Sequence, residues 1–282
     1  MNSKSSRALF KNYTQKLQDL YATDEAISQV QWLFEHFLMI YRKDLLLDKK
    51  ITAIPEGLEF AMSKLLSGTP IQYVLGKAHF YGRDFFVSPH VLIPRFETEE
   101  LVHLIIGENT FDAPNILDVG TGSGCIPITL WLEIPQSKVT GIDISPEAIA
   151  VASQNAGTLN ATVDFLQVDI LQDEIPTGPW DIIVSNPPYV RNLEKEAMHQ
   201  NVLDHEPALA LFVSDEDPLL FYRVITQKST RNLNAGGKLY FEINEGFGPE
   251  TKLLLEQKGF VDVTIHRDLQ GKNRMVRGTW LG

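Results

Sequence analysis

The stretch that decides the fold is ILDVGTGSGC at residues 116–125. A short run rich in branched apolar residues leads into Gly120, Gly122 and Gly124, and an apolar segment follows. Glycine tolerates positive φ angles and lets a ligand approach the backbone closely. The first turn of a following helix offers free N–H groups and the positive end of the helix dipole. The stretch therefore predicts a strand, a glycine-rich ligand-binding turn and a helix.

Other glycine-rich motifs fit this turn less well. A phosphate-binding loop ends in Gly-Lys followed by Ser or Thr, and this turn contains no lysine. A nucleophile elbow reads Gly-x-Ser-x-Gly, whereas glycines flank Ser123 directly. A dinucleotide fingerprint reads G-x-G-x-x-G, and here the third glycine comes one residue early. The spacing G-x-G-x-G is the form familiar from Rossmann-like methyltransferases, and a tight packing turn is the alternative without a ligand.

Strand-like and helix-like segments alternate on both sides of this turn, from residue 113 to the end of the chain. Such alternation favours a largely parallel sheet with helices on both faces, and ligands of such sheets bind beyond the carboxyl ends of the strands. The expected strands are residues 114–120, 137–145, 162–170, 180–188, 238–244 and 261–268, and the expected helices are residues 123–135, 146–159, 217–237 and 249–260.

Acidic residues end the next two predicted strands. Asp143 follows the glycines by about twenty residues, where a carboxylate can accept hydrogen bonds from both ribose hydroxyls. Its alternative role is a turn or helix-cap aspartate. Asp169 could accept from an adenine amino group, with Ile170 against the ring. These residues predict an adenosine-bearing ligand, but they do not separate S-adenosylmethionine from NAD.

The fourth predicted strand ends in Asn186, Pro187, Pro188 and Tyr189. Each proline fixes its own φ and restricts the residue before it, so the loop is stiff and presents carbonyl acceptors. Acceptors on both N–H bonds of a planar NH₂ group favour a pyramidal nitrogen with a localised lone pair. Attack on a sulfonium methyl group then needs alignment and no metal. The alternative is a purely structural role, in which the loop ends the strand and buries Tyr189.

Composition and charge restrict the class of protein. The chain has 282 residues and a formal net charge of -11. Its one cysteine, Cys125, cannot form an intrachain disulfide, and we expect it to pack in the core. The acidic balance argues against broad binding of nucleic acid. No signal peptide, membrane-spanning run or metal-ligand motif is evident, so we expect a cytoplasmic protein without a metal.

The chain is expected to divide into three parts. Residues 1–75 show apolar residues at helical spacing and predict a helical substrate-docking domain, with a plain helical bundle as the alternative. Residues 76–94 mix aromatic and β-branched residues with glycines and prolines and predict a β-hairpin linker. Residues 95–282 form the expected α/β, Rossmann-like methyltransferase domain.

Taken together, these motifs resemble those of the release factor glutamine methyltransferases. The resemblance runs through nearly the whole chain and includes GTPIQYVLGKAHFYGRDFFVSPHVLIPRFETEELV, ILDVGTGSGC, GIDISPEAIAVASQNA, IIVSNPPYV and RDLQGKNRMVRG. It implies transfer of a methyl group from S-adenosylmethionine, leaving S-adenosylhomocysteine, to the side-chain amide nitrogen of glutamine in the Gly-Gly-Gln motif of peptide chain release factors. It also implies a monomer without a membrane or direct nucleic-acid partner.

The resemblance assigns roles to matching residues. Asn186 and the Pro187 carbonyl would accept from the glutamine NH₂ group, while Pro188 and Tyr189 would shape its slot. Arg95, Glu97 and Thr98 would close over the site. The family usually has proline where this chain has Phe96, and glycine is common where it has Asn244. The residues expected to contact the cofactor are Gly120, Thr121, Gly122, Ser123, Gly124, Asp143, Asp169, Ile170 and Asn186.

Other functions remain possible at this stage. A glutamine methyltransferase that acts on a ribosomal protein would have identical chemistry. An adenine amino methyltransferase acting on DNA or RNA shares the N-P-P-Y motif, although the negative charge opposes it. An NAD-binding oxidoreductase is opposed by the glycine spacing. A scaffold that binds the cofactor without turnover is opposed by the intact N-P-P-Y.

Overall fold

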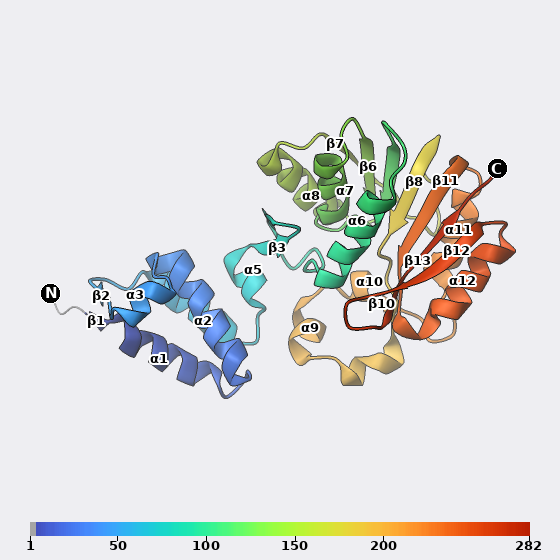
Figure 1. The fold of residues 1–282 in the computed structure, drawn as a ribbon. Coiled ribbons are helices and arrows are strands. Elements are labelled where there is room, and N and C mark those ends of the chain that lie inside the picture. Colours follow the sequence, from blue (N-terminus) through green and yellow to red (C-terminus); the bar gives the residue numbers. More distant parts are fainter. Residues whose placement is uncertain (1–3) are drawn as a thin grey trace. The chain divides into compact units, whose positions relative to one another are not determined.

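The computed structural model describes residues 4–282, which divide into two compact units (Figure 1). One unit contains the N-terminal residues through Lys77 together with the later segment His199–His205. The other contains Ala78–Met198 and Glu206–Gly282. The chain therefore leaves the larger unit once, for seven residues, and then returns to it.

The N-terminal unit is helical, and its apolar faces enclose one core. In α2 the apolar spacing places Val30, Leu33 and Phe34 in that core, with Phe34 fully buried, whereas Ile27 shares the spacing but is exposed. Tyr13 stands edge-to-face on Phe34, with 6.0 Å between ring centroids. The elements are β1 (Lys4–Ser5), α1 (Ser6–Leu17), α2 (Thr23–Leu38), α3 (Arg42–Leu46), β2 (Lys50–Ile51), α4 (Glu56–Leu66) and α5 (Ile71–Leu75).

The later segment completes this unit with the short helix α9 (Gln200–His205). The side-chain amide Nδ2 of Asn201 in α9 donates to the Tyr21 hydroxyl at 3.2 Å. A Cβ atom on Gly68, after α4, would lie 3.3 Å from Oδ1 of Asn201. Helix α9 therefore packs within the helical unit, although it follows Lys77 by more than a hundred residues in the sequence.

The larger unit is built on a seven-stranded sheet with the order β12-β13-β11-β8-β5-β6-β7. Strands β11, β8, β5, β6 and β7 run parallel, and β13 is antiparallel to both of its neighbours. The strands are β5 (Asn115–Val119), β6 (Lys138–Asp143), β7 (Val163–Gln167), β8 (Trp180–Ser185), β11 (Leu233–Glu242), β12 (Val261–Arg267) and β13 (Asn273–Thr279). The expected Rossmann-like α/β fold is confirmed.

Helices cover both faces of this sheet, as Figure 1 shows. Alternation along β5 sends Ile116 into one core and Leu117 into the other. The first core contains apolar side chains from α6 (Phe96–Glu108), α7 (Cys125–Glu133) and α8 (Pro146–Leu159); the second contains those from α11 (Leu220–Ser229) and α12 (Gly248–Gln257). The smaller elements are β3 (Ala78–Phe80), β4 (Arg83–Phe85), β9 (Val190–Arg191), the 3₁₀ helix η1 (Asn192–Ala197), α10 (Ala208–Leu211), β10 (Phe212–Val213) and the 3₁₀ helix η2 (Glu245–Phe247).

One predicted element has the wrong length. The helix expected over residues 217–237 ends at Ser229, and β11 already begins at Leu233. The pairing of β11 with β8 is irregular between Leu233 and Lys238, where Gly236 has φ +82°. Gly236 and Gly237 therefore lie in the irregular first part of strand β11, and they do not end a helix as expected.

The order of the strands places a switch point at the middle of the sheet. From β5 the chain adds β6 and then β7 on one side, and β8 then pairs with the other side of β5. Connections that leave β5 and β8 in opposite directions open a crevice at the carboxyl ends of these strands. The glycine turn and the Asn-Pro-Pro loop lie at these two ends.

Candidate functional site

A cleft opens at the carboxyl ends of β5, β6, β7 and β8. Its empty volume is about 1170 Å³ when the open solvent at its mouth is included. Of the residues expected at the site, those that line the cleft are Arg95, Thr98, Gly120, Thr121, Gly122, Ser123, Asp143, Asp169, Ile170, Asn186, Pro187 and Pro188. Within the described chain, Glu97, Gly124 and Tyr189 are not among the lining residues.

The glycine turn is held by backbone bonds from the neighbouring strand. The N–H groups of Gly120 and Thr121 both donate to the Ile142 carbonyl of β6, each at 2.9 Å. Gly120 has φ +79° and Gly122 has φ +54°. A Cβ atom on Gly122 would meet no atom within 4 Å, and one on Gly120 would meet only the Asn186 carbonyl, at 3.9 Å. These two glycines therefore keep the backbone bare where it faces the cleft.

Gly124 has a different role from the one expected. It has φ +78°, and a Cβ atom there would lie 3.0 Å from Cβ of Ala152 and from Cδ1 of Ile128. The residue therefore lets helix α8 approach the start of α7. Nearby, Asn155 of α8 accepts from the Phe86 N–H at 2.7 Å and donates to the Ser123 carbonyl at 2.9 Å. The turn is thus fastened to α8 on its buried side.

Asp143 lies at the end of β6 and joins two turns. Its Oδ2 accepts from the Gly122 N–H at 2.9 Å, and its Oδ1 accepts from the Ser145 N–H at 3.0 Å. Burial raises the pKa of this carboxyl above its usual range, against the opposing effect of these backbone bonds. Each oxygen retains acceptor capacity toward the cleft. Asp143 therefore does stabilise turns, as the alternative interpretation predicted, and its remaining acceptor capacity is available to a ligand.

Asp169 and Ile170 follow β7 and form the far wall of the cleft. Oδ1 of Asp169 accepts from the Leu171 N–H at 2.9 Å, and the Ile170 carbonyl accepts from Nζ of Lys228 at 2.8 Å. Ile170 is partly buried against the second core. The loop after β7 is consequently fixed, with an exposed acidic edge beside an apolar side chain.

The loop after β8 is fixed by the strands around it. The Ser185 hydroxyl donates to the Val119 carbonyl at 2.7 Å, which ties the end of β8 to the end of β5. Asn186 follows, and its Nδ2 donates to the Thr98 hydroxyl of α6 at 3.1 Å. With Nδ2 so engaged, the amide oxygen of Asn186 is the free end of the side chain. Pro187 and Pro188 then contribute carbonyl groups and no backbone donor.

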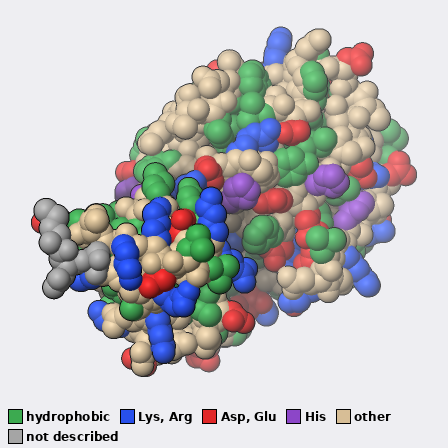
Figure 2. Space-filling model, turned by 60° about the vertical axis from the view of Figure 1, so that its left-hand side comes forward, with side chains coloured by type: hydrophobic (Ala, Val, Ile, Leu, Met, Phe, Trp, Pro, Cys, Tyr) green, Lys and Arg blue, Asp and Glu red, His purple; other side chains and the backbone are tan. Residues whose placement is uncertain are grey.

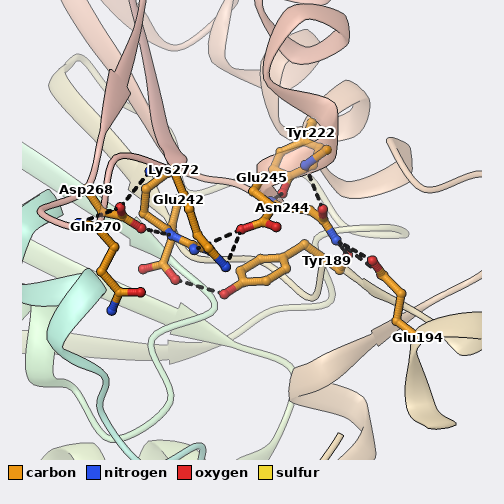
Figure 3. Close-up of polar contacts among 11 residues, drawn as sticks. Tyr189, Glu194, Tyr222, Glu242, Asn244, Glu245, Asp268, Gln270 and Lys272 are labelled. Carbon is orange, nitrogen blue, oxygen red and sulfur yellow. Dashed lines mark hydrogen bonds and ion pairs between the residues drawn. The ribbon is translucent and has the colours of Figure 1, made fainter. Parts of the chain in front are cut away.

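Tyr189 points away from the cleft into a buried polar network, which Figure 3 shows in close-up. Its hydroxyl donates to Oε1 of Glu242 at 3.0 Å, and its carbonyl accepts from Nδ2 of Asn244 at 3.2 Å. Asn244 also donates to the Glu194 carboxylate at 3.1 Å, and its Oδ1 accepts from the Gly246 N–H. The asparagine found where the family commonly has glycine therefore connects three loops.

Glu242 is the acid at the centre of this network. The residue is 1% exposed, and its Oε2 accepts from the Thr98 hydroxyl at 2.7 Å. Burial raises the pKa of its carboxyl. Arg274 lies nearby in β13 but pairs with Asp268 at 3.1 Å. Glu242 was not among the residues expected at the site, although a lone acid inside the apolar stretch KLYFEI indicates a buried polar group.

Arg95 is anchored at the edge of the cleft by a second acid that the sequence analysis missed. Its guanidinium donates to Oε1 of Glu206 at 2.6 Å. The side chain of Glu206 is 1% exposed, and its Oε2 accepts from the Ile93 N–H at 3.2 Å. A buried carboxylate with two donors holds the arginine in one position. Glu97 and the exposed Phe96 form the first turn of α6 beside it.

Two further buried groups lie behind the glycine turn. Asp118 of β5 is fully buried, and neither of its oxygens is hydrogen-bonded within residues 4–282. Burial raises the pKa of Asp118 to about 7. The Cys125 thiol is also buried, which raises its pKa to about 12 and keeps it protonated at neutral pH. The thiol is therefore no nucleophile, and Asp118 is a buried acid next to the Thr121 side chain of the glycine turn.

The described residues, 4–282, contain no group of three or more His, Cys, Asp or Glu side chains arranged to hold a metal ion. Across the same residues, no helix is both long and apolar enough to cross a membrane.

Comparison with known proteins places these features in a family. A family model described as "Methyltransferase small domain" matches residues 98–210. A curated release factor glutamine methyltransferase from Flavobacterium psychrophilum is 46% identical over 280 residues, which cover 95% of this chain and 98% of the relative. One from Bacteroides thetaiotaomicron is 46% identical over 93% of this chain and 95% of the relative.

Solved structures share the fold. A methyltransferase from Pyrococcus furiosus has a TM-score of 0.52 and 17% identity, and the alignment covers 79% of this chain and 99% of that one. The T. thermophilus 16S rRNA N2 G1207 methyltransferase, solved with AdoMet and guanosine, has a TM-score of 0.52 and 16% identity, and the alignment covers 72% of this chain and 49% of that one. Both likenesses concern the α/β architecture.

Proposed function

The chain belongs to the release factor glutamine methyltransferase family, and on that premise we propose that it methylates the side-chain amide nitrogen of glutamine in the Gly-Gly-Gln motif of release factors. The methyl donor is S-adenosylmethionine. One observation carries the proposal. The amide of Asn186 is fixed by Thr98 beside a glycine turn whose backbone is bare, so an acceptor and a cofactor cradle share one cleft.

The residues present fit S-adenosylmethionine. Gly120 and Gly122 line the cleft and have no Cβ, so their backbone leaves room for a ligand to approach closely. Gly120, Thr121, Gly122 and Ser123 would hold the methionine part, with Gly124 keeping the turn against α8, and Asp143 would hold the ribose. Asp169 and Ile170 would meet the adenine.

When bound, the cofactor supplies an electrophilic methyl group, and the chain prepares the nucleophile. Asn186 Oδ1 and the Pro187 carbonyl would accept from the two N–H bonds of the glutamine amide. These contacts favour a pyramidal nitrogen, and they stabilise the positive charge that develops on it. Because Pro187 and Pro188 fix the loop, little reorganisation is needed at the moment of reaction. The nitrogen would then lose one N–H proton to solvent water, which leaves a neutral N-methyl amide.

We assign supporting roles to the residues around the slot. Arg95, anchored by Glu206 at the cleft edge, would contact the backbone of the Gly-Gly-Gln loop. Glu97 lies two residues after Arg95, in the first turn of α6, and would contact the same loop from outside the cleft. Pro188 lines the slot directly. Tyr189 would shape it indirectly, since its hydroxyl is bound to Glu242.

The N-terminal unit is proposed to dock the release factor. The N-terminal unit, residues 1–77 and 199–205, contains 10 of the 25 Lys and Arg residues and 9 of the 36 Asp and Glu residues, so the larger unit contains 15 and 27. The acidic excess therefore lies entirely outside the N-terminal unit. Figure 2 shows blue Lys and Arg side chains over that unit, where Arg7, Arg42, Lys49 and Lys50 are exposed. This unit is close to neutral, so it repels an acidic protein partner less than the larger unit does.

This function places the protein in the cytoplasm, where translation termination occurs, and we expect it to act as a monomer without a direct nucleic-acid partner. Its substrate would be a protein rather than a small molecule.

Mass spectrometry of a bacterial release factor tests the function. The intact protein would be incubated with S-adenosylmethionine and the release factor, and the Gly-Gly-Gln peptide analysed for one added methyl group on glutamine. A release factor with alanine in place of that glutamine is the matched control. No methylation, with S-adenosylmethionine still bound, would reject the substrate and direct the search to glutamines of ribosomal proteins or to adenine in nucleic acid.

A further inference from the structure

A continuous polar chain connects the cleft to the middle of the sheet. It begins at Asn186, whose Nδ2 donates to the Thr98 hydroxyl at 3.1 Å. Thr98 donates in turn to Oε2 of Glu242 at 2.7 Å. Thr98 is 3% exposed and Glu242 is 1% exposed, so water does not compete for these groups. The chain joins three elements far apart in sequence: the loop after β8, helix α6 and strand β11.

The chemistry of the three groups gives this chain a direction. Both oxygens of Glu242 accept hydrogen bonds, Oε1 from the Tyr189 hydroxyl and Oε2 from the Thr98 hydroxyl, so the single hydroxyl proton of Thr98 is used in the bond to Glu242. The Thr98 oxygen can then only accept, and the group that faces it must be a donor. The NH₂ end of the Asn186 amide is that donor. Its oxygen is consequently directed to the other side, which is the cleft.

The orientation of this amide matters for the reaction proposed above. With Oδ1 toward the cleft, Asn186 accepts from the substrate NH₂ group. With the amide reversed, two NH₂ groups would face each other, and the acceptor would be lost. We propose that Glu242 is a positioning residue, which acts through Thr98 to hold the Asn186 amide with its oxygen toward the substrate. This inference rests on the proposed methyl transfer, and it gives Glu242, which does not line the cleft, a role in that reaction.

A role in stability alone does not explain a carboxylate at this position. Within the described residues, no Lys or Arg nitrogen lies within ion-pair distance of Glu242, because Arg274 is engaged by Asp268 and Glu245. An isolated buried charge costs stability, and a neutral residue of the same shape would cost less. The two groups that contact its oxygens, Thr98 and Tyr189, are both hydroxyl donors. A carboxylate can accept from the Thr98 and Tyr189 hydroxyls at the same time, one on each oxygen.

Three substitutions separate positioning from packing. Glu242→Gln keeps the shape but brings an NH₂ group, which can donate to Thr98 and so permit the reversed amide. Thr98→Val removes the hydroxyl with little change in volume, and Thr98→Ser restores it. Thr251→Val is the matched control, because Thr251 is fully buried in α12, outside the cleft, and its hydroxyl has no partner within residues 4–282.

Steady-state methylation of the release factor, cofactor affinity by calorimetry and the melting temperature would be measured for each variant. We expect Thr98→Val and Glu242→Gln to lower kcat about tenfold or more, the cost of one buried hydrogen bond to a charged group. KM for the release factor and Kd for S-adenosylmethionine should stay near the wild-type values. Thr98→Ser should recover most of kcat. Glu242→Gln should melt no lower than the wild-type protein.

The outcomes that overturn the inference are distinct from failure of the proposed function. If the wild-type protein methylates the release factor and Thr98→Val leaves kcat unchanged, Glu242 does not act through Thr98. If Thr98→Ser is as slow as Thr98→Val, or if Thr251→Val is equally slow, loss of packing explains the effect. If Glu242→Gln does not fold, the Thr98 pair decides the question alone. If the wild-type protein is inactive, the function itself fails.

Discussion

The substitution Gly120→Ala tests whether the glycine turn holds the cofactor. Gly120 has φ +79°, and its Cβ position is open apart from the Asn186 carbonyl at 3.9 Å. The new methyl group would therefore meet no clash in the protein alone. It would stand at the boundary between the turn and Asn186, where the proposed methyl transfer takes place.

The expected loss of stability follows from the backbone angle. An alanine in the left-handed region costs about 1–2 kcal/mol. For a domain of this size, each kcal/mol lowers Tm by about 2–4 °C. Gly236, in the same unit, has φ +82° and also has an open Cβ position, but it lies in β11 away from the cleft. Gly236→Ala should therefore lose about as much stability as Gly120→Ala, and it serves as the control.

The two variants should differ in the affinity for S-adenosylmethionine. Calorimetric titration should show at least a tenfold weaker Kd for Gly120→Ala, about 1.4 kcal/mol, because the methyl group occupies the cradle. Gly236→Ala should bind the cofactor as the wild-type protein does. Equal cofactor affinity of Gly120→Ala and Gly236→Ala, at equal loss of Tm, would refute the assignment of this turn to the cofactor.

The other predictions concern the polar groups of the cleft. Asn186→Ala should abolish most methyl transfer while Kd for S-adenosylmethionine changes little; turnover at the wild-type rate in the methylation assay would reject its role as acceptor. Asp143→Ala should chiefly weaken cofactor affinity, and an unchanged calorimetric Kd would reject the ribose assignment. Asp118 has its pKa raised from 3.8 to about 7 by burial, so the native state keeps a proton that the unfolded chain has lost between these pH values. The stability of the wild-type protein relative to Asp118→Asn should therefore fall as pH rises from about 4 to about 7 and then level off. Parallel melting curves of the two proteins across this range, with a constant difference in Tm, would contradict the raised pKa.

Much of the fold was predictable because local patterns determined it. The glycine turn, the acids after β6 and β7 and the alternation of strands and helices all depend on residues close together in the sequence. The irregular start of β11 was not predicted, since LNAGG can end a helix or begin a strand, and only the pairing with β8 decides. The antiparallel strand β13 was also missed, because its sequence NRMVRGT has little apolar alternation.

The residues of the candidate site were likewise predictable only where a local motif marks them. The expected residues that line the cleft each follow a strand or belong to a motif, whereas other lining residues, such as His90, Leu209 and Phe221, carry no such signal. Glu206 and Glu242 were not assigned a role, because the residues they contact, Arg95 and Thr98, are far away in the sequence. Tyr189 was expected to face a flat substrate group but binds Glu242 instead. The apolar stretch KLYFEI indicates that Glu242 is buried, but the partners of a buried acid depend on residues that are distant in the sequence.

The position of α9 has a consequence for how this protein can be divided or recombined. The helical unit is assembled from two pieces of the gene, since Asn201 of α9 completes the surroundings of Tyr21. A fragment that ends at Lys77 would lack that helix, and a catalytic part expressed alone would carry it without a partner. Exchange of substrate modules between relatives by a single crossover would therefore leave an incomplete interface. An exchange that keeps the helical unit whole must transfer both segments, residues 1–77 and 199–205.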